Sequence, residues 1–315
     1  MRTFLLKSLV FLMLVIVIFY ALDQMALNGL NKLRDDDYKD LHLLFNNEID
    51  DEVLIVGSSR AWNHFDVSEI QKITGISTRV VGLSGADFNM QRVLWEQALN
   101  NVSDTEYIVH VVGSLEFSKR TDGVFRKYKF YPFLNNQYVQ SNLSKIQPDL
   151  WKDQYLPMYK FHGYYNYFLK GLKLNFVNPS YDEYYKYKGF TGFKNIWNGT
   201  ITVESKVISD DDINKGMNFI EYEAKLAAEK EKQLILVYTP EHKVTDSLIN
   251  GKNKIIERLN DLALNHSNMH FLDYSKWYGN DDISLFSNAT HLNVKGAKLF
   301  SQTFAKDFLE ILKNN

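Results

Sequence analysis

The chain of 315 residues contains no cysteine. This absence excludes structural disulfides, thiolate metal ligands and cysteine nucleophiles. It suits a bacterial protein that folds outside the cytoplasm without disulfide bonds. The sequence also indicates no metal site, and we expect no cofactor.

An excess of either charge is missing as well. Lys and Arg together number 36 and Asp and Glu 38, so the net charge is −2. No basic excess indicates nucleic acid as a partner, and no acidic run indicates a disordered tail. Proline is scarce, with five residues, whereas hydrophobic residues make up 45% of the chain. The chain is therefore expected to fold around a substantial core, as one large domain or two small ones.

A long apolar run stands near the N-terminus. Arg2 and Lys7 precede the stretch SLVFLMLVIVIFYAL, residues 8–22. With residues 4–6 it reaches roughly the 17–20 residues that cross a bilayer. Ala21 is a poor cleavage site, because Phe19 stands two positions before it. Residues 1–23 are therefore predicted to be a retained signal anchor rather than a cleaved signal peptide.

The charges around this run predict its orientation. Basic residues precede it, and the acidic stretch LRDDDYKD follows soon after. This places the N-terminus in the cytoplasm and residues from about 24 onward outside. We expect a single-pass protein of the bacterial inner or cytoplasmic membrane, with its main domain in the periplasm or at the cell surface. Residues 24–50 are expected to form a juxtamembrane linker or helix.

Beyond residue 50, short apolar runs alternate with segments of helical periodicity. This alternation predicts a mostly parallel sheet with helices on both faces, of the doubly wound, flavodoxin-like α/β class. The expected strands are 52–60, 78–85, 106–113, 233–240 and 269–275. The expected helices are 66–75, with an Asp start and a Gly stop, 86–101, 212–232, 251–265 and about 294–312.

An aromatic-rich segment of about residues 117–212 interrupts this rhythm within the predicted domain 51–315. Linkers are poor in aromatic residues, so this segment is not a linker. One interpretation is a mainly helical insertion that packs its rings on the core. The other is an exposed aromatic platform, which would suit sugar rings or a membrane interface.

Polar and small residues follow several of the predicted strands. Sites in such sheets form at the carboxyl ends of the strands. Ser58 and Ser59 end the first strand, and Gly85 ends the second. His291 lies in the loop SNATHLNVKGAKLFS, just before the last helix. The loop is expected to return His291 to the same edge of the sheet.

These stretches together resemble the SGNH/GDSL hydrolase superfamily. In that family a nucleophilic Ser follows the first strand in a G-x-S turn, a Gly follows the second strand, an Asn the third, and D-x-x-H stands near the C-terminus. The resemblance covers about residues 52–116 and 233–312. With the anchor and the aromatic insertion, the chain looks most like membrane-tethered members that modify cell-envelope polysaccharides, such as alginate O-acetyltransferase-like proteins.

The resemblance implies that Ser59 is the nucleophile and His291 its base, with Ser58 replacing the Asp of the common G-D-S form. A serine hydroxyl needs such a base at neutral pH. The residues alone leave other roles open: Ser58 and Ser59 would also suit the cap of a following helix. His291 would also suit a loop histidine that binds Asn288 or a carbonyl group.

Two positions depart from the family pattern. The backbone N–H groups of Ser59 and Gly85 match oxyanion donors, but the position of the family's Asn is Leu115, which cannot donate. Ser114 is a candidate replacement. The position of the family's acid is Asn288, which brings no charge and would favour the wrong histidine tautomer if its amide faced the ring. Substitute acids are the nearby carboxylates Asp273, Asp281 and Asp282.

Two further residues are candidate substrate ligands. Arg60 could bind a substrate carboxylate or phosphate, or form an ordinary ion pair. His64 is a candidate lining residue of the pocket. His110, inside a predicted strand, is expected to be a hydrogen-bonded core residue.

Taken together, the sequence predicts an extracytoplasmic serine esterase or O-acyltransferase that acts on a cell-envelope or exported polysaccharide. Its expected partners are the lipid bilayer, the polysaccharide and an integral-membrane protein that donates the acyl group. The alternative is a catalytically impaired SGNH-fold domain that binds glycan or scaffolds an envelope assembly. Asn288 and Leu115 keep that alternative open.

Overall fold

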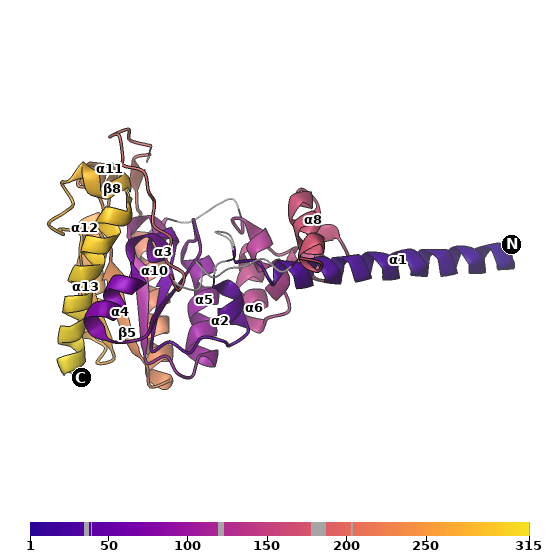
Figure 1. Ribbon diagram of the computed structural model, residues 1–315, viewed down its shortest axis with the longest axis horizontal. Coiled ribbons are helices and arrows are strands. Elements are labelled where there is room, and N and C mark those ends of the chain that lie inside the picture. Colours follow the sequence, from indigo (N-terminus) through magenta and orange to yellow (C-terminus); the bar gives the residue numbers. More distant parts are fainter. Residues whose placement is uncertain (35–37, 39, 119–122, 178–186, 203, 315) are drawn as a thin grey trace. The chain divides into compact units, whose positions relative to one another are not determined.

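The computed structural model of the protein describes residues 1–34, 38, 40–118, 123–177, 187–202 and 204–314. The chain forms two compact units (Figure 1). One unit, called the anchor unit below, comprises Met1–His42 and Asp122–Tyr181. The other, called the sheet unit, comprises Leu43–Thr121 and Asp182–Asn315. This is a division by packing, and the predicted sequence boundaries at residues 23, 50, 117 and 212 stay predictions.

A five-stranded parallel sheet forms the centre of the sheet unit, in the order β2-β1-β3-β5-β7. Counted among these five strands, the order is 2-1-3-4-5, which is the flavodoxin-like arrangement. The predicted α/β fold class is thus confirmed. The strands are β1 (Val53–Gly57), β2 (Thr78–Gly82), β3 (Tyr107–Val112), β5 (Gln233–Tyr238) and β7 (Met269–Asp273).

Helices cover both faces of this sheet, because nearly every residue of the inner strands is apolar and must be buried from both sides. One face packs against α3, α4 and α13, with Phe300, Phe304 and Phe308 of α13 in its core. The other face packs against α5, α10 and α12. The bounds are α3 (Ser59–His64), α4 (Val67–Thr74), α5 (Phe88–Asn101), α10 (Asp210–Glu229), α12 (Lys252–Leu264) and α13 (Val294–Asn314).

The helix signals seen in the sequence are realised in α4. The side chain of Asp66 accepts a hydrogen bond from the backbone N–H of Ser68 and so caps the first turn. Gly75 ends the helix with a φ of 74°, in the left-handed region that glycine adopts without strain. His110, in the middle of β3, is buried between Glu223 and Gln91, as expected of a hydrogen-bonded core residue.

Shorter elements complete the sheet unit. The hairpin of β8 and β9 precedes α13 and carries the predicted site histidine. The other short elements are η1 (Ser114–Phe117), β4 (Lys206–Val207), α11 (Thr245–Leu248), β6 (Ile249–Asn250), η4 (Ile283–Leu285), β8 (Phe286–Asn288) and β9 (His291–Leu292). Helix α2 (Leu41–Phe45) crosses the sequence boundary between the units.

The anchor unit is helical. It consists of α1 (Arg2–Leu30), η2 (Lys127–Phe133), α6 (Gln137–Ile146), α7 (Leu150–Tyr155), η3 (Tyr159–Phe161) and α8 (Tyr165–Leu174). Its aromatic rings pack on one another, for example Tyr131 on Phe161 with ring centroids 5.6 Å apart. The described part of the insertion that belongs to this unit is therefore helical with its own small aromatic core.

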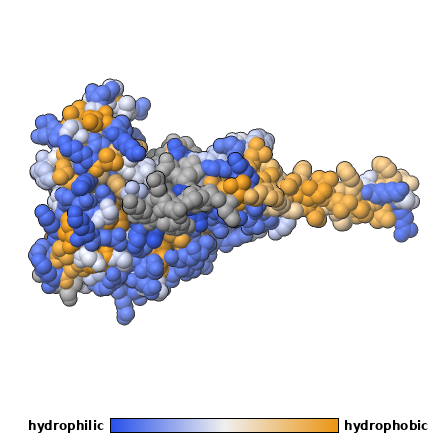
Figure 2. Space-filling view, viewed as in Figure 1, coloured by the Kyte–Doolittle hydropathy of each residue, from blue (hydrophilic) through white to orange (hydrophobic). Residues whose placement is uncertain are grey.

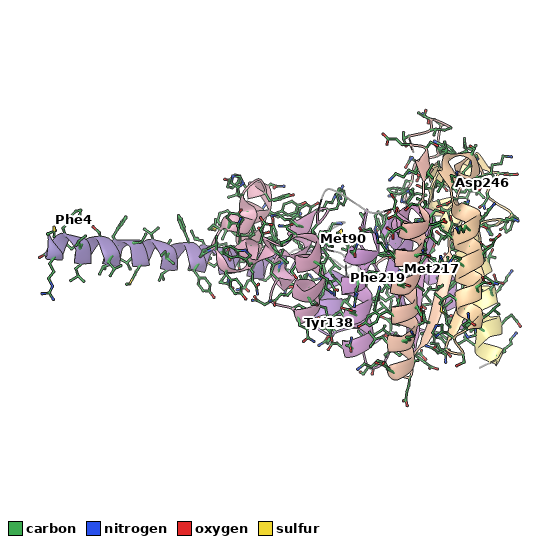
Figure 3. All side chains as sticks on the ribbon, turned by 180° about the vertical axis from the view of Figure 1, so that it is seen from behind. Phe4, Met90, Tyr138, Met217, Phe219 and Asp246 are labelled. Atoms are coloured by element: carbon green, nitrogen blue, oxygen red, sulfur yellow. The ribbon has the colours of Figure 1, made fainter. Side chains whose placement is uncertain are left out.

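Helix α1 is long and apolar enough to cross a membrane. Its most apolar window has a mean hydropathy of 2.6, and none of that window is buried. Figure 2 shows the hydrophobic surface along the helix, and in Figure 3 the side chains near Phe4 stand free of other parts of the chain. The helix continues past the predicted span to Leu30, and its last turns are packed inside the unit.

Candidate active site

The nucleophile turn lies where β1 ends and α3 begins. Gly57 closes β1 and pairs with Gly82 at the end of β2, so both strand ends lie at the same edge. Ser58 is the N-cap of α3, since its Oγ accepts from the backbone N–H of Arg60 at 3.5 Å. The same Oγ donates to Glu116 at 2.6 Å. Ser58 is thus a capping residue, which leaves Ser59 as the first residue of the helix, half-buried and open to solvent.

His291 meets this turn from the other end of the chain. Its Nε2 lies 2.8 Å from Ser59 Oγ, although the two residues are 232 positions apart. The hairpin β8–β9 places it there by pairing Asn288 with His291 in antiparallel register. The geometry is that of a serine and a general base within hydrogen-bond reach.

The orientation of Asn288 decides which nitrogen of His291 carries the proton. Asn288 Oδ1 lies 3.0 Å from the backbone N of Thr290 and 3.1 Å from His291 Nδ1. A backbone N–H can only donate, so the Asn288 atom that faces it must be the carbonyl oxygen. That oxygen then accepts from Nδ1–H as well. The lone pair of Nε2 therefore faces Ser59, which is the productive tautomer.

The Thr290 hydroxyl supports the same arrangement. Its Oγ1 lies 3.2 Å from Asn288 Oδ1 and 3.1 Å from His291 Nδ1. It can donate to the amide oxygen while it accepts from the ring. The sequence did not single out Thr290 as a site residue, because a Thr inside a short loop has no signal of its own.

Burial and the positive charge of Arg60 lower the pKa of His291 from 6.5 to about 3. The ring is enclosed by Phe193 and His64, with ring centroids 5.6 and 6.0 Å away. The imidazole is thus neutral at physiological pH and ready to accept a proton. However, among the described residues no carboxylate contacts the ring to stabilise the imidazolium that would form, so the base is a weak one.

The three predicted substitute acids are occupied elsewhere. Asp273 accepts from the backbone N–H of Ser275 at 2.8 Å, and Asp282 accepts from that of Ser284 at 2.9 Å. Asp281 forms an exposed ion pair with Lys243 at 3.3 Å. Within the described ranges, the side-chain partners of His291 Nδ1 are Asn288 and Thr290. None of the three aspartates takes the position of the acid.

Arg60 lies in the core instead of in a pocket. Its side chain is 4% exposed and binds Glu241 Oε1 at 2.7 Å and Glu116 Oε2 in a short ion pair. A buried guanidinium needs such carboxylate partners, because an unpaired buried charge is very costly. The ion-pair alternative therefore applies, and Arg60 is not retained as a substrate ligand. Glu116 and Glu241 were not predicted as its partners, although both follow the ends of neighbouring strands.

Ser114 belongs to the same buried network. Its Oγ lies 2.7 Å from the Tyr238 hydroxyl, which in turn donates to Glu241 Oε2 at 3.2 Å. Lys252 Nζ completes the network, 3.3 Å from Glu241. Ser114 is fully buried and engaged with Tyr238, so its side chain is not an oxyanion donor.

His64 is fully buried, so it does not line a pocket. Its Nε2 accepts a hydrogen bond from the backbone N–H of Leu292 at 3.2 Å. Burial, the neighbouring His291 and Arg60 hold the pKa of His64 well below 6.5. Neutral His64 thereby ties α3 to β9, the two elements that carry Ser59 and His291.

The two backbone positions predicted as oxyanion donors lie at the same edge of the sheet. Gly85 stands in the turn after β2 with a φ of 68°, which favours glycine. This turn is tied to the end of β1, because the N–H of Leu83 donates to Gly57 O at 2.9 Å. Leu115 lies in η1 and offers no side-chain donor. The oxyanion role of Ser59 and Gly85 stays a prediction.

Phe193 is a site residue that the sequence did not single out. It comes from the aromatic insertion, yet its backbone carbonyl accepts from the N–H of Val294 at 2.8 Å. Its ring stands edge-on to His291 and 5.7 Å from the ring of Trp62. This part of the insertion therefore forms an apolar wall beside the serine–histidine pair.

A cleft of about 1190 Å³ lies elsewhere in the sheet unit, along β4, β6 and the start of α12. Charges of both signs line it, including Asp246, Lys254 and Asp273, and Figure 3 labels Asp246. Neither Ser59 nor His291 is among its lining residues. The chemistry of the serine–histidine pair is therefore separate from this cleft.

Comparisons with known proteins leave the family open. No family model and no curated protein matches the chain. A solved structure from Streptococcus pneumoniae, provisionally described as a platelet activating factor, has 12% identity and a TM-score of 0.43, covering 96% of this chain and 98% of its own. A provisionally described acylhydrolase from Bacteroides fragilis has 12% identity and a TM-score of 0.42, covering 87% and 99%.

An acetyl-xylooligosaccharide esterase from Geobacillus stearothermophilus has 13% identity and a TM-score of 0.40, covering 81% of this chain and 93% of its own. At these values the likeness carries no information on activity. Function has to be inferred from the geometry of the site itself.

Proposed function

We propose that the protein is a serine acyl-transfer enzyme of the SGNH type. The observation that carries this proposal is the 2.8 Å contact between Ser59 Oγ and His291 Nε2, with Asn288 holding Nδ1 in the productive tautomer. A half-buried histidine that only made hydrogen bonds within its loop would not need its free nitrogen at a partly exposed serine hydroxyl.

The reaction follows from this geometry. Ser59 Oγ attacks the carbonyl carbon of an ester while His291 Nε2 takes the hydroxyl proton. The tetrahedral intermediate collapses, the ester C–O bond breaks, and the leaving alkoxide takes the proton from His291. The acyl-enzyme then reacts with water, as in an esterase, or with a sugar hydroxyl, as in an O-acyltransferase; His291 takes the proton of the incoming group and returns it to Ser59.

Two features set the rate that this site can reach. The neutral Asn288 fixes the tautomer of His291, but it brings no charge to stabilise the imidazolium that forms when His291 takes the proton. The oxyanion hole would have the two backbone donors of Ser59 and Gly85, without the third donor that Leu115 replaces. We therefore expect slow but serine-dependent turnover.

The proposed substrate is a cell-envelope or exported polysaccharide. Helix α1 would hold the protein in the bacterial cytoplasmic membrane, with the site on the outer side. Phe193 would present an apolar wall to the acyl group or the sugar ring beside His291. An integral-membrane partner that delivers the acyl group would fit such a tethered enzyme.

A non-catalytic role is the second candidate function. Asn288 and Leu115 stand where the family has a carboxylate and an amide donor, and both changes lower catalytic power. A domain of the same fold could then bind glycan or scaffold an envelope assembly.

Serine reactivity separates the two candidates. The full chain in detergent is incubated with a fluorophosphonate probe and, separately, with p-nitrophenyl acetate. Labelling and slow turnover are expected for the wild type and should be lost in Ser59→Ala and His291→Ala. Ser275→Ala, whose side chain lies outside the site, is the matched control. Labelling that persists in Ser59→Ala, or its absence from the wild type, would sink the enzyme proposal.

A further inference from the structure

An apolar patch of the anchor unit lies where α1 leaves the unit. Residues 4–21 of α1 are almost all exposed, whereas Asp23, Ala26, Gly29 and Leu30 are buried. The exposed stretch is about 27 Å long at 1.5 Å per residue, close to the roughly 30 Å hydrocarbon core of a bilayer. The helix therefore enters the folded unit at the point where the proposed span ends.

Side-chain contacts of Asp23 and Asn175 show which segments surround α1 where it enters the unit. Asp23 forms a buried ion pair with Lys160 at 2.7 Å and accepts from the backbone N–H of Met158 at 2.9 Å. The side chain of Asn175 donates to Met25 O at 2.7 Å. The segments around residues 158 and 175 thus lie at the level of residues 23–25, only about 3–6 Å beyond Ala21.

Helix α8 packs against α1, and Asn175, directly after its C-terminal end, contacts α1 at Met25. Gly171 packs so closely against α1 that an added Cβ would lie 2.3 Å from Ala26 O. At the other end of α8, the ring of Tyr167 lies 6.4 Å from that of Tyr38, well past the span in sequence. The two helices are beside each other in Figure 1.

Large apolar side chains are exposed at this level. Phe176 is 80% exposed and Val177 follows it, both just beyond Asn175. Tyr155, Leu156 and Tyr159 are exposed on the turn that leads into Met158 and Lys160. We call these five residues (155, 156, 159, 176 and 177) the juxtamembrane patch. Leaving such a cluster in water would be unfavourable, and Tyr and Phe are enriched where protein meets the headgroup layer.

We propose that the juxtamembrane patch lies in the headgroup layer of the lipid bilayer that α1 spans. This inference rests on the membrane span of the proposed function and is independent of the acyl-transfer chemistry. The layer is about 5–8 Å thick on each side, which matches the height of the patch above the end of the span. The exposed Lys173 of α8 adds positive charge that suits anionic headgroups. The anchor unit would thus rest on the membrane surface instead of hanging from a flexible tether.

The absence of cysteine allows a direct test. Single-cysteine variants Val177→Cys and Leu156→Cys in the patch are labelled with a fluorophore in the full chain. Tyr165→Cys, at the far end of α8, is the matched exposed control, and Ile18→Cys reports on the span. The labelled proteins are placed in vesicles of phosphatidylglycerol and phosphatidylethanolamine. Quenching by lipids with brominated acyl chains is then compared with quenching by aqueous iodide.

The inference expects quenching by brominated lipid and protection from iodide at positions 18, 156 and 177, and the reverse at position 165. Lipid quenching at position 18 with full iodide access at 156 and 177 would overturn it and leave the span intact. That result would instead point to a protein partner covering the patch in the cell. Iodide access at position 18 would show that α1 does not span, and would overturn the membrane proposal together with this one. Circular dichroism of each variant confirms that the helices are retained.

Discussion

At the scale of single residues, neighbouring side chains at the nucleophile turn have opposite tasks. Ser58 turns inward to Glu116, Ser59 faces His291, and Arg60 enters the core between two glutamates. In the sequence, Ser58 and Ser59 are equal candidates for capping. The structure separates their roles. Only the residue at the N-cap position, Ser58, accepts the capping hydrogen bond from the backbone N–H of Arg60. Ser59 is the first residue of the helix, so its hydroxyl is left to face His291.

Asn288→Asp is expected to strengthen the site. A carboxylate would accept from Nδ1–H and stabilise the imidazolium, so kcat/KM for p-nitrophenyl acetate should rise by about 10², which corresponds to roughly 2.7 kcal/mol of added stabilisation. The pH profile should change as well. His291 acts as a base only when neutral, so the acid limb of the wild type is expected near its pKa of about 3. The added negative charge should move this limb toward about pH 6.5.

The measurement is the pH dependence of acylation in the two proteins. Asn288→Ala serves as the control, because it leaves Thr290 as the one side-chain partner of Nδ1 among the described residues and should lower activity at every pH. An acid limb that stays in place in Asn288→Asp would mean that His291 is not the base.

At the scale of elements, a buried charge network holds α3 to the ends of β3 and β5. Arg60 of α3 meets Glu116 after β3 and Glu241 after β5, and Lys252 at the start of α12 shares Glu241. His64 binds the same helix to β9. These contacts fix the helix that presents Ser59 relative to the hairpin that presents His291.

Glu241→Ala is expected to destabilise the sheet unit by about 3–5 kcal/mol, because it leaves the buried charges of Arg60 and Lys252 undercompensated. Its denaturant midpoint should fall, and the rate at which the fluorophosphonate labels Ser59 should fall with it under native conditions. Asp211→Ala is the matched control, since it removes an exposed ion pair with Lys215 and should cost less than about 1 kcal/mol. An equal loss of unfolding free energy in the two variants would show that the buried network stabilises the fold no more than an exposed ion pair does.

The same elements show what the sequence could predict. The five strands and the helices around them followed from local apolar runs and caps such as Asp66 and Gly75, which are short-range signals. The hairpin β8–β9 did not, because two or three residues carry too little pattern. The sequence also could not predict the partners of Arg60. Glu241 lies 181 residues away along the chain, and burial rather than residue type decides that Arg60 forms an ion pair.

At the scale of the whole molecule, stability should depend on pH through buried neutral histidine. The pKa of His64 is held well below 6.5 in the folded state, chiefly by burial. Below about pH 6.5 the unfolded chain therefore binds a proton that the folded chain does not, so stability falls as pH falls, and it is fully present above that value. The slope is about 1.4 kcal/mol per pH unit for such a group.

This dependence can be measured by urea unfolding of the full chain in detergent between about pH 7.5 and about pH 5, the range that brackets the titration of an unfolded histidine. His64→Gln, which can still accept from the N–H of Leu292, should flatten the slope. His162→Gln, at an exposed position, should not. An unchanged slope in His64→Gln would assign the pH dependence to other groups.

The buried pair of Asp23 and Lys160 has a consequence for where the protein can reside. The pair fixes the C-terminal end of the proposed span, because Asp23 could enter the hydrocarbon core only by breaking its ion pair with Lys160. The span therefore cannot lengthen by drawing residues out of the folded unit. In a thicker bilayer it must instead thin the lipid around it, which costs a fraction of a kcal/mol for each ångström of mismatch. Membrane thickness would then act on this chain as a sorting signal, with thinner bilayers preferred.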